Sequence, residues 1–340
     1  MKTLLIGNYF LGKQHPPNVW QDLSDQLTKA DYSVLISSHK TNKVLRLLDM
    51  LITIIRRKKQ FDIAKIDVFS GQAFIWSFMS GMLLRYLNKP FILTLHGGNL
   101  PDYAAKHPKR VRWLLNSAKK VVVPSQYLFI AMQMYRTDLL LIPNAIEIKK
   151  YDFKNRTNIK PHLIWLRAFH KIYNPELAIR ALALLVDILP EVFLTMIGPD
   201  KGDGSLQDTK RLAENLGVRK YIQFTGSIQK SDVPTYLNKG DIFINTTNYD
   251  NTPISVMEAM ACGMCVISTN VGGVPYLVND ETNGLLVPPD NPERFAQAIY
   301  RVLTDADLAY KLSSNARKKA EQLDWSIILP QWQKLLDSIK

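Results

Sequence analysis

Two carboxylates, Asp250 and Glu258, stand in the stretch YDNTPISVMEAMACGMCVISTNVGGVPYLV (249–278), which otherwise has the apolar character of a buried helix and a buried strand. At the rise of an α-helix, their separation of eight residues puts their backbones roughly 8–12 Å apart. A retaining glycosidase needs carboxyl groups about 5 Å apart, so this pair does not fit a nucleophile and an acid acting on one bond. The spacing favours acids that hold the two ends of an extended ligand.

A predicted helix start lies between these acids. Thr252 is a suitable N-cap, Pro253 a suitable first helical residue and Gly263 a suitable C-cap. The free N–H groups and the dipole of such an N-terminus favour an anion such as phosphate. A nucleotide diphosphate sugar has this shape, with a charged middle and two polar ends. The alternative is that Asp250 is a turn residue and Glu258 an exposed helix position.

Short apolar runs alternate with helical patterns along the chain. Runs of aliphatic and β-branched residues between helices indicate parallel sheets covered on both faces. We therefore predict an α/β fold of two Rossmann-like, doubly wound domains with a ligand cleft between them. Strands are predicted at 3–7, 32–37, 63–69, 90–96, 120–124, 139–143, 162–166, 192–198, 222–226, 241–246, 265–269 and 284–288.

The domain boundaries follow from a change of composition. Residues 1–150 form the predicted first domain, and the polar, aperiodic segment 149–160 is the predicted linker. The second domain is expected over 151–323. The amphipathic C-terminal helix, 324–340, is expected to cross back onto the first domain.

The segment from Asp250 to Pro275 resembles the C-terminal signature of the retaining glycosyltransferases of family 4, which have the GT-B fold. That signature is E-x7-E followed by EAMA-x-G and T-x-x-GG-x-P, and this chain has Asp250-x7-Glu258, EAMACG, Thr269 and GGVP (272–275). Segments similar to the family's other landmarks cover nearly the whole chain. They are LTLHGG (93–98), VVVPSQYL (121–128), IPNAIE (142–147), IGPDKGDG (197–204) and GLLVPPDNPERFAQAI (284–299).

The resemblance implies a metal-independent, retaining hexosyltransferase, with an N-terminal acceptor-side domain and a C-terminal donor domain that binds a nucleotide sugar, preferably a UDP-sugar. By the same resemblance, Glu258 grips the ribose. Asp250, which replaces the family's glutamate, contacts the donor sugar. The remaining donor-pocket positions carried over are Gly97, Gly198, Asn251, Thr252, Pro253, Ile254 and Ser255.

Three further side chains are carried over from the family. Arg167 and Lys171, in WLRAFHKIYNP, match the Arg and Lys that neutralise the diphosphate as negative charge develops on it. His96, at the end of the strand FILTL, matches a histidine that contacts the donor sugar near the reacting carbon. The alternative for Lys171 is a solvated loop lysine, and for His96 a structural histidine.

The chain departs from the family after its first strand, where GNYFLGKQHPPN (7–18) replaces the usual Gly-Gly loop. Gly12 and Lys13 are the candidates left there for the acceptor and phosphate side. No spacing suggests a metal site, and no cofactor is indicated. Because no nucleophile of the enzyme is evident, the expected reaction is front-face transfer, in which the leaving phosphate assists the acceptor hydroxyl.

The net charge of +13 belongs entirely to the first half of the chain. Residues 1–150 hold 22 Lys and Arg against 9 Asp and Glu, whereas 151–340 hold 21 of each kind. The clusters 42–59 and 106–113 favour an anionic membrane surface as a partner, with a glycan or lipid-diphosphate-linked acceptor. Nucleic acid is not expected, since no binding module is recognised. No stretch reaches the roughly 20 apolar residues of a membrane span, so a cytoplasmic protein on the inner membrane face is expected.

Other functions remain open on the sequence alone. A nucleotide-sugar epimerase would use the same cleft, and a phosphorylase would usually need a lysine-bound pyridoxal cofactor. A catalytically silent scaffold that binds sugar nucleotide is a third possibility, against which the set Arg167 and Glu258 argues. A role in bacterial surface polysaccharide assembly is expected from the resemblance.

Overall fold

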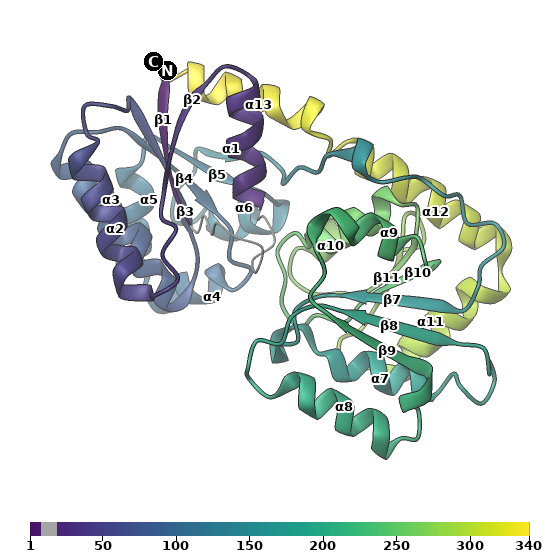
Figure 1. The fold of residues 1–340 in the computed structure, drawn as a ribbon. Helices are drawn as coiled ribbons and strands as arrows, with labels where there is room; N and C mark the ends of the chain where they lie inside the picture. Colours follow the sequence, from purple (N-terminus) through teal and green to yellow (C-terminus); the bar gives the residue numbers. More distant parts are fainter. Residues whose placement is uncertain (8–18, 340) are drawn as a thin grey trace. The chain divides into compact units, whose positions relative to one another are not determined.

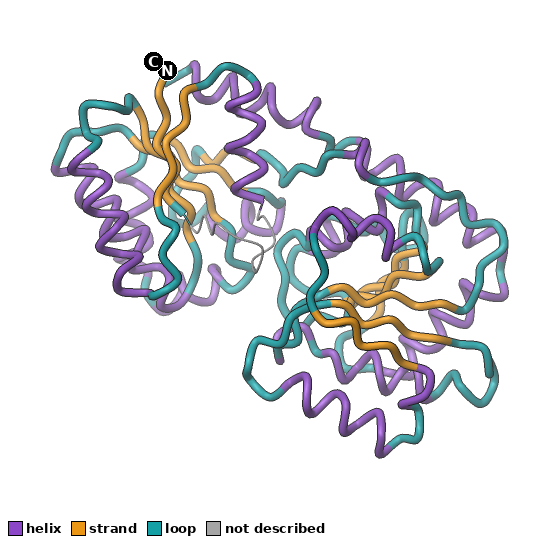
Figure 2. The backbone as a smooth tube through the Cα atoms, in the orientation of Figure 1, coloured by secondary structure: helices purple, strands orange, loops and turns teal. Residues whose placement is uncertain are grey.

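The computed structural model describes residues 1–7 and 19–339, and over these the chain forms two compact units, each built around a six-stranded parallel sheet (Figures 1 and 2). Unit 1 comprises Met1–Ala145 and Trp325–Lys340, and unit 2 comprises Ile146–Asp324. Helices cover both faces of each sheet. The prediction of two Rossmann-like, doubly wound α/β domains is confirmed.

The sheet of unit 1 has the strand order β2-β1-β3-β4-β5-β6. Strand β2 pairs with one side of β1, and β3 pairs with the other side of β1. This reversal of direction makes the sheet doubly wound. Its strands are β1 (Lys2–Ile6), β2 (Ser33–Ser37), β3 (Ile63–Val68), β4 (Phe91–Leu95), β5 (Lys120–Val123) and β6 (Leu139–Leu141).

Alternate residues of these strands enter two different cores. Ile66 and Leu93 pack under α2, α3 and α5, whereas Ile63 and Ile92 pack under α1 and α13. This alternation follows from the two-residue period of a strand. The helices of the unit are α1 (Val19–Lys29), α2 (Lys43–Arg56), α3 (Phe74–Tyr86), α4 (Leu100–Lys106), α5 (Pro108–Ser117), α6 (Gln126–Met132) and α13 (Trp325–Asp337).

The C-terminal helix α13 belongs to unit 1, although it follows unit 2 in sequence. Trp325 and Trp332 of α13 are buried with Leu23 and Leu27 of α1. Both passages of the chain between the units lie together on unit 2, because Ile146 bridges Asp324 there. The large apolar rings of Trp325 and Trp332 stabilise the packing of α13 against α1.

The sheet of unit 2 has the order β12-β11-β10-β7-β8-β9. Here the chain reverses direction between β7 and β10, which are parallel neighbours. Ligands of doubly wound sheets bind at the carboxyl ends of the strands flanking this switch point. The strands are β7 (His162–Leu166), β8 (Phe193–Ile197), β9 (Ile222–Gly226), β10 (Ile242–Asn245), β11 (Cys265–Thr269) and β12 (Leu285–Val287).

Helices α7, α8 and α11 lie on one face of this sheet, and α9 and α10 lie on the other (Figure 1). Helix α12 contributes Leu308 and Leu312 to the first core and Ala316 and Ala320 to the second. The helices are α7 (Pro175–Ala183), α8 (Ser205–Asn215), α9 (Val233–Leu237), α10 (Ile254–Ala261), α11 (Pro292–Thr304) and α12 (Ala306–Glu321).

The segment 149–160 is not a free linker, and the expectation of one is wrong. Arg156 is 1% exposed and pairs with Asp241. Its guanidinium also donates to the carbonyls of Lys154 and Cys262, the latter at the end of α10. The segment is polar because it carries this buried network, so its composition resembles that of a linker while its packing is that of a core.

No helix in the part of the chain that the structure describes combines the length and the apolar character needed to cross a bilayer.

Candidate active site

The predicted donor-site residues of unit 2 gather at the carboxyl ends of β7 and β10. Arg167 directly follows β7, and Asp250 lies in the loop that connects β10 to α10. Because β7 and β10 are parallel neighbours, their ends meet at the switch point of the sheet. Arg167 and Asp250 form an ion pair there.

The guanidinium of Arg167 is held from several sides. Its side chain is 16% exposed, and its carbon Cζ lies 4.6 Å from the centre of the Tyr173 ring. Burial lowers the pKa of Arg167, while Tyr173 and Glu258 act in the opposite direction. The Nε atom of Arg167 is buried and has no hydrogen-bond partner among the described residues. A buried cation with an unmet donor is costly unless an anion joins it.

Glu258 is a buried carboxylate on α10, only 6% exposed. The hydroxyl of Tyr151 donates to its Oε1 at 2.8 Å. This excludes the alternative of an exposed helix position for Glu258. Sequence reasoning missed Tyr151, since it lies 107 residues away in the segment taken for a linker, and no local pattern marks it.

Helix α10 begins one residue later than the sequence predicts. Pro253 has extended backbone angles (φ −69°, ψ 114°) and occupies the N-cap, so Ile254 is the first helical residue. The prediction of Thr252 as N-cap is therefore wrong. The side chain of Pro253 has no group that could cap this end. The hydroxyl of Ser255, in the first turn, is buried and has no hydrogen-bond partner among the described residues. The first turn of α10 thus contains one unmet hydroxyl, and Asn251, just before the helix, is buried.

Glycines let the backbone close around the Asp250 loop. Gly273 donates its N–H to the carbonyl of Asp250 at 3.0 Å, and a Cβ on Gly273 would overlap the carbonyl oxygen of Asn251. Gly272 has a positive φ of 54°, and a Cβ there would overlap the carbonyl of Asp250. Gly198 likewise leaves no room for a Cβ beside the carbonyl of Arg167. These close approaches explain why glycines stand at 198, 272 and 273.

Lys171 is placed differently from Arg167. It begins a short 3₁₀ helix, is exposed, and its backbone N–H donates to Asp203 at 2.9 Å. Its side chain makes no hydrogen bond or ion pair with the described residues. The structure thus brings Arg167, Asp250 and Glu258 together and leaves the Lys171 side chain outside their contacts.

In unit 1, His96 follows β4 and belongs to a buried polar cluster. Its Nε2 lies 2.8 Å from Oδ1 of Asp67, and the same oxygen pairs with Lys65. Sequence reasoning missed Lys65 and Asp67. A signal was present, because two opposite charges at i and i+2 in an apolar strand share one face. Gly97, the next residue, packs closely on Ser70. Gly12 and Lys13 lie outside the described residues.

The arrangement can bind an anion between a guanidinium and a helix N-terminus, with a carboxylate on either side for hydroxyl groups. Together with two doubly wound parallel sheets, this defines the class of the GT-B glycosyltransferases. The chain belongs to the glycosyl transferases group 1 family, whose model matches residues 147–319. The model of glycosyltransferase family 4 matches residues 17–150.

A curated relative is D-inositol 3-phosphate glycosyltransferase of Streptomyces bingchenggensis, 29% identical over 157 residues. The match covers 44% of this chain and only 34% of that relative's length. Among solved structures, sucrose-phosphate synthase from Thermosynechococcus elongatus has a TM-score of 0.81 at 20% identity, over 99% of this chain and 98% of that one. Anabaena Alr3699/HepE in complex with UDP-glucose has a TM-score of 0.79 at 18% identity, over 99% and 100%. The structural likeness shows the fold, and the family models show the membership.

Proposed function

We propose that this chain is a retaining, metal-independent transferase that moves a sugar from a UDP-sugar to a glycan or lipid-diphosphate-linked acceptor in bacterial surface polysaccharide assembly. UDP is favoured because solved complexes of the similar HepE chain hold UDP and UDP-glucose. Arg167 and the start of α10 then hold the diphosphate, Glu258 the ribose, and Asp250 the sugar.

The observation that carries the proposal is the Arg167 cluster. Its ion pair with Asp250 leaves the Nε donor unmet, and the unmet Ser255 hydroxyl marks the N-terminus of α10. A diphosphate supplies acceptors for both. The carboxylates of Asp250 and Glu258 can accept hydrogen bonds from hydroxyl groups, whereas the guanidinium of Arg167 and the start of α10 favour the phosphates.

The proposed chemical step needs no nucleophile from the protein. The bond between the sugar's anomeric carbon and the β-phosphate oxygen breaks, and its electron pair stays on the phosphate. The acceptor oxygen attacks the same face and gives its proton to that phosphate. Arg167 and the free N–H groups of α10 stabilise the charge that develops on the leaving group, which is why no metal ion is invoked.

The test is calorimetric titration, in metal-free buffer, with the UDP, GDP and ADP forms of several sugars. One donor is expected to bind the wild type. Glu258→Ala is expected to abolish binding, and Tyr151→Phe to weaken it by about 10- to 100-fold, since one hydrogen bond to a charged group is lost. Tyr310→Phe, on an exposed tyrosine of α12, serves as the control.

Absence of binding across the panel, with a folded protein, would overturn the transferase proposal. Binding without release of UDP in the presence of candidate acceptors would point to the scaffold. Conversion of the donor to another nucleotide sugar would point to an epimerase.

A second observation favours the membrane surface. The outer face of α2 is apolar: Val44, Leu45, Leu48, Ile52 and Ile55 are between 44% and 66% exposed. We call these five residues the apolar stripe. The cations at 56–59 are exposed beside it, and α5, in the same helical layer, exposes Lys109, Arg110 and Arg112. An exposed apolar surface favours binding of a partner. The clustered cations repel a second copy of this chain and attract anionic lipid headgroups.

Vesicle flotation tests this docking. The wild type is expected to float with phosphatidylglycerol-containing vesicles and to remain behind with pure phosphatidylcholine. The double substitution Leu48→Gln and Ile52→Gln is expected to reduce binding at least about tenfold, because each buried aliphatic side chain contributes about 1.5–3 kcal/mol. Ile188→Gln with Leu216→Gln, exposed apolar residues of unit 2, is the control. Equal flotation of both double variants would contradict docking through the stripe.

A further inference from the structure

A short turn of unit 2 brings an aromatic ring against Arg167. Lys171–Tyr173 form a 3₁₀ helix, and Tyr173, its last residue, is partly buried against the core of the unit. The centre of the Tyr173 ring lies 4.6 Å from Cζ of Arg167. Lys171, from the same turn, is exposed. The turn therefore presents a ring, and not a second cation, to the guanidinium.

The ring supplies a restraint on Arg167 that the ion pair does not. The pair with Asp250 joins one terminal nitrogen, Nη2, to one carboxylate oxygen. A single contact of this kind does not fix the plane of the guanidinium, because the group can rotate about it. Guanidinium groups stack on aromatic faces, so the Tyr173 ring removes that freedom. The direction of the unmet Nε donor is then set as well.

The turn itself is tied to the end of β10 through its backbone. Oγ1 of Thr246 donates to the carbonyl of Tyr173 at 2.8 Å. Oγ1 of Thr247 and the N–H of Asn248 both donate to the carbonyl of Ile172, at 3.2 and 2.8 Å. These donors directly follow β10 in sequence, so the end of that strand fixes the backbone of the turn.

The hydroxyl of Thr246 has its direction imposed by Trp165, a fully buried residue of β7. Nε1 of Trp165 donates to Oγ1 of Thr246 at 2.9 Å. An indole nitrogen can only donate, so the hydroxyl accepts at that contact and its single proton goes to the Tyr173 carbonyl. The strand that leads to Arg167 thus also orients the turn that stacks on it.

We propose that Tyr173 is a positioning residue for Arg167, and that Thr246 holds Tyr173 in place. The ring fixes the plane in which the Arg167 donors lie, and therefore the direction from which a diphosphate can accept hydrogen bonds from them. The catalytic part of this inference rests on the proposed function. Arg167 stabilises a leaving phosphate best when its donors are oriented beforehand, because no reorganisation is then needed as charge develops.

The first test needs no sugar nucleotide. Protein labelled with ¹⁵N-arginine gives side-chain Nε–H signals, and that of Arg167 is assigned by its loss in Arg167→Lys. Tyr173→Leu is expected to speed hydrogen exchange of this Nε–H at least about tenfold, the effect of losing a desolvated cation–π contact. Tyr173→Phe keeps the ring and should behave like the wild type. Unchanged exchange in Tyr173→Leu overturns the proposal, because Asp250 alone would then hold the guanidinium.

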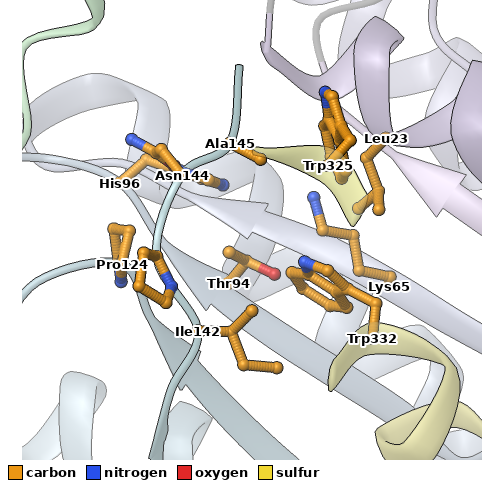
Figure 3. A pocket seen from close by; sticks show the side chains of 11 residues that line it. Leu23, Lys65, Thr94, His96, Pro124, Ile142, Asn144, Ala145, Trp325 and Trp332 are labelled. Carbon is orange, nitrogen blue, oxygen red and sulfur yellow. The ribbon is translucent and has the colours of Figure 1, made fainter. Parts of the chain in front are cut away.

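Two controls separate the loss of the stacked ring from a loss of packing. Tyr221→Leu removes another tyrosine that ends a 3₁₀ helix, is partly buried against the same core and has a lysine over its ring. Leu23→Ala enlarges a pocket of unit 1 beside Trp325 and Trp332 (Figure 3), which lowers stability without changing a side chain of unit 2. Both should leave the Arg167 signal unchanged. An equal acceleration in either control contradicts positioning by Tyr173.

The second test measures sugar transfer. Tyr173→Leu is expected to lower kcat/KM by about 10- to 30-fold, mainly through kcat, and Tyr173→Phe to restore it. In an Arg167→Ala background, Tyr173→Leu should have no further effect, since no guanidinium is left to orient. Effects that multiply contradict the proposal, and so does a loss in Tyr173→Phe equal to that in Tyr173→Leu. Absence of transfer by the wild type contradicts only the proposed function, and the exchange measurement then decides on Tyr173.

Thr246→Val tests how the turn is held, and it serves as the second variant if Tyr173→Leu does not fold. It should change exchange and transfer in the same direction, by about 2- to 10-fold, because one hydrogen bond to the turn is lost. Thr246→Ser keeps the hydroxyl and should behave like the wild type. The control is Thr209→Val, on a buried threonine of α8 whose hydroxyl donates to the carbonyl of Ser205. Equal behaviour of the two valine variants contradicts the role of Thr246.

Discussion

Replacing Arg167 by alanine is expected to lower kcat/KM for sugar transfer by about 100- to 1,000-fold, the range typical of losing one preorganised group that stabilises developing charge. Arg167 is the cation at the switch point of unit 2, paired with Asp250 and stacked on Tyr173. Its guanidinium is already oriented before the donor arrives, so little reorganisation is needed as the phosphate leaves. The measurement is the initial rate of UDP release with the donor found by calorimetry.

Two comparisons make this result specific. Arg180→Ala removes an exposed arginine of α7 whose partner is Glu176, and it should leave the rate unchanged. Arg167→Lys keeps the charge but loses the planar fork and the stacking, so it should recover only part of the activity. If Arg167→Ala lowers donor affinity but leaves kcat intact, the arginine binds the ground state only, and its proposed role in the transition state is wrong.

Replacing Arg156 by methionine is expected to lower the free energy of unfolding by about 3–5 kcal/mol, because it leaves Asp241 buried without its guanidinium partner. The change also frees the carbonyls of Cys262 and Gly240, to which Arg156 donates. Urea denaturation of the whole chain, followed by circular dichroism, gives the difference.

Lys154→Met is the matched control for Arg156→Met. Lys154 pairs with the same Asp241 oxygen at 3.0 Å, but its side chain is 55% exposed. A solvated pair contributes at most about 1 kcal/mol, so this variant should unfold almost like the wild type. Similar losses for both substitutions would mean that burial does not set the strength of the Asp241 pairs.

The sequence predicted the sheets of both units and the order of their elements. This prediction succeeded because a strand that is buried on both faces has a continuous apolar sequence, which can be recognised locally. FILTL and HLIWL are such runs. Element ends were less exact. Helix α10 starts at Ile254 because Pro253 keeps an extended ψ, and the preference of proline for a first helical position did not decide the matter.

The candidate site was only partly readable from the chain. Asp250, Glu258 and Arg167 could be predicted as site residues, because a charged side chain beside a buried apolar run is costly unless it binds a partner or a ligand. Tyr151 could not, because its partner Glu258 is distant in sequence and a tyrosine in a polar segment has no distinctive pattern. Lys65 and Asp67 left a trace, as opposite charges on one face of the strand IAKIDV. What they do depends on His96, which comes from the next strand.

The sequence by itself determined the periodicities, the motif with its two acids and the family it resembles. These are carried by residues near one another along the chain, where spacing translates directly into geometry. Only the tertiary structure decided which charges pair: Arg167 with Asp250, Tyr151 with Glu258, and Asp67 with both Lys65 and His96. It also decided that 149–160 is packed into unit 2. Pairings of this kind depend on which strands become neighbours and which carboxylates lose their water, and both are settled only when the whole sheet has formed.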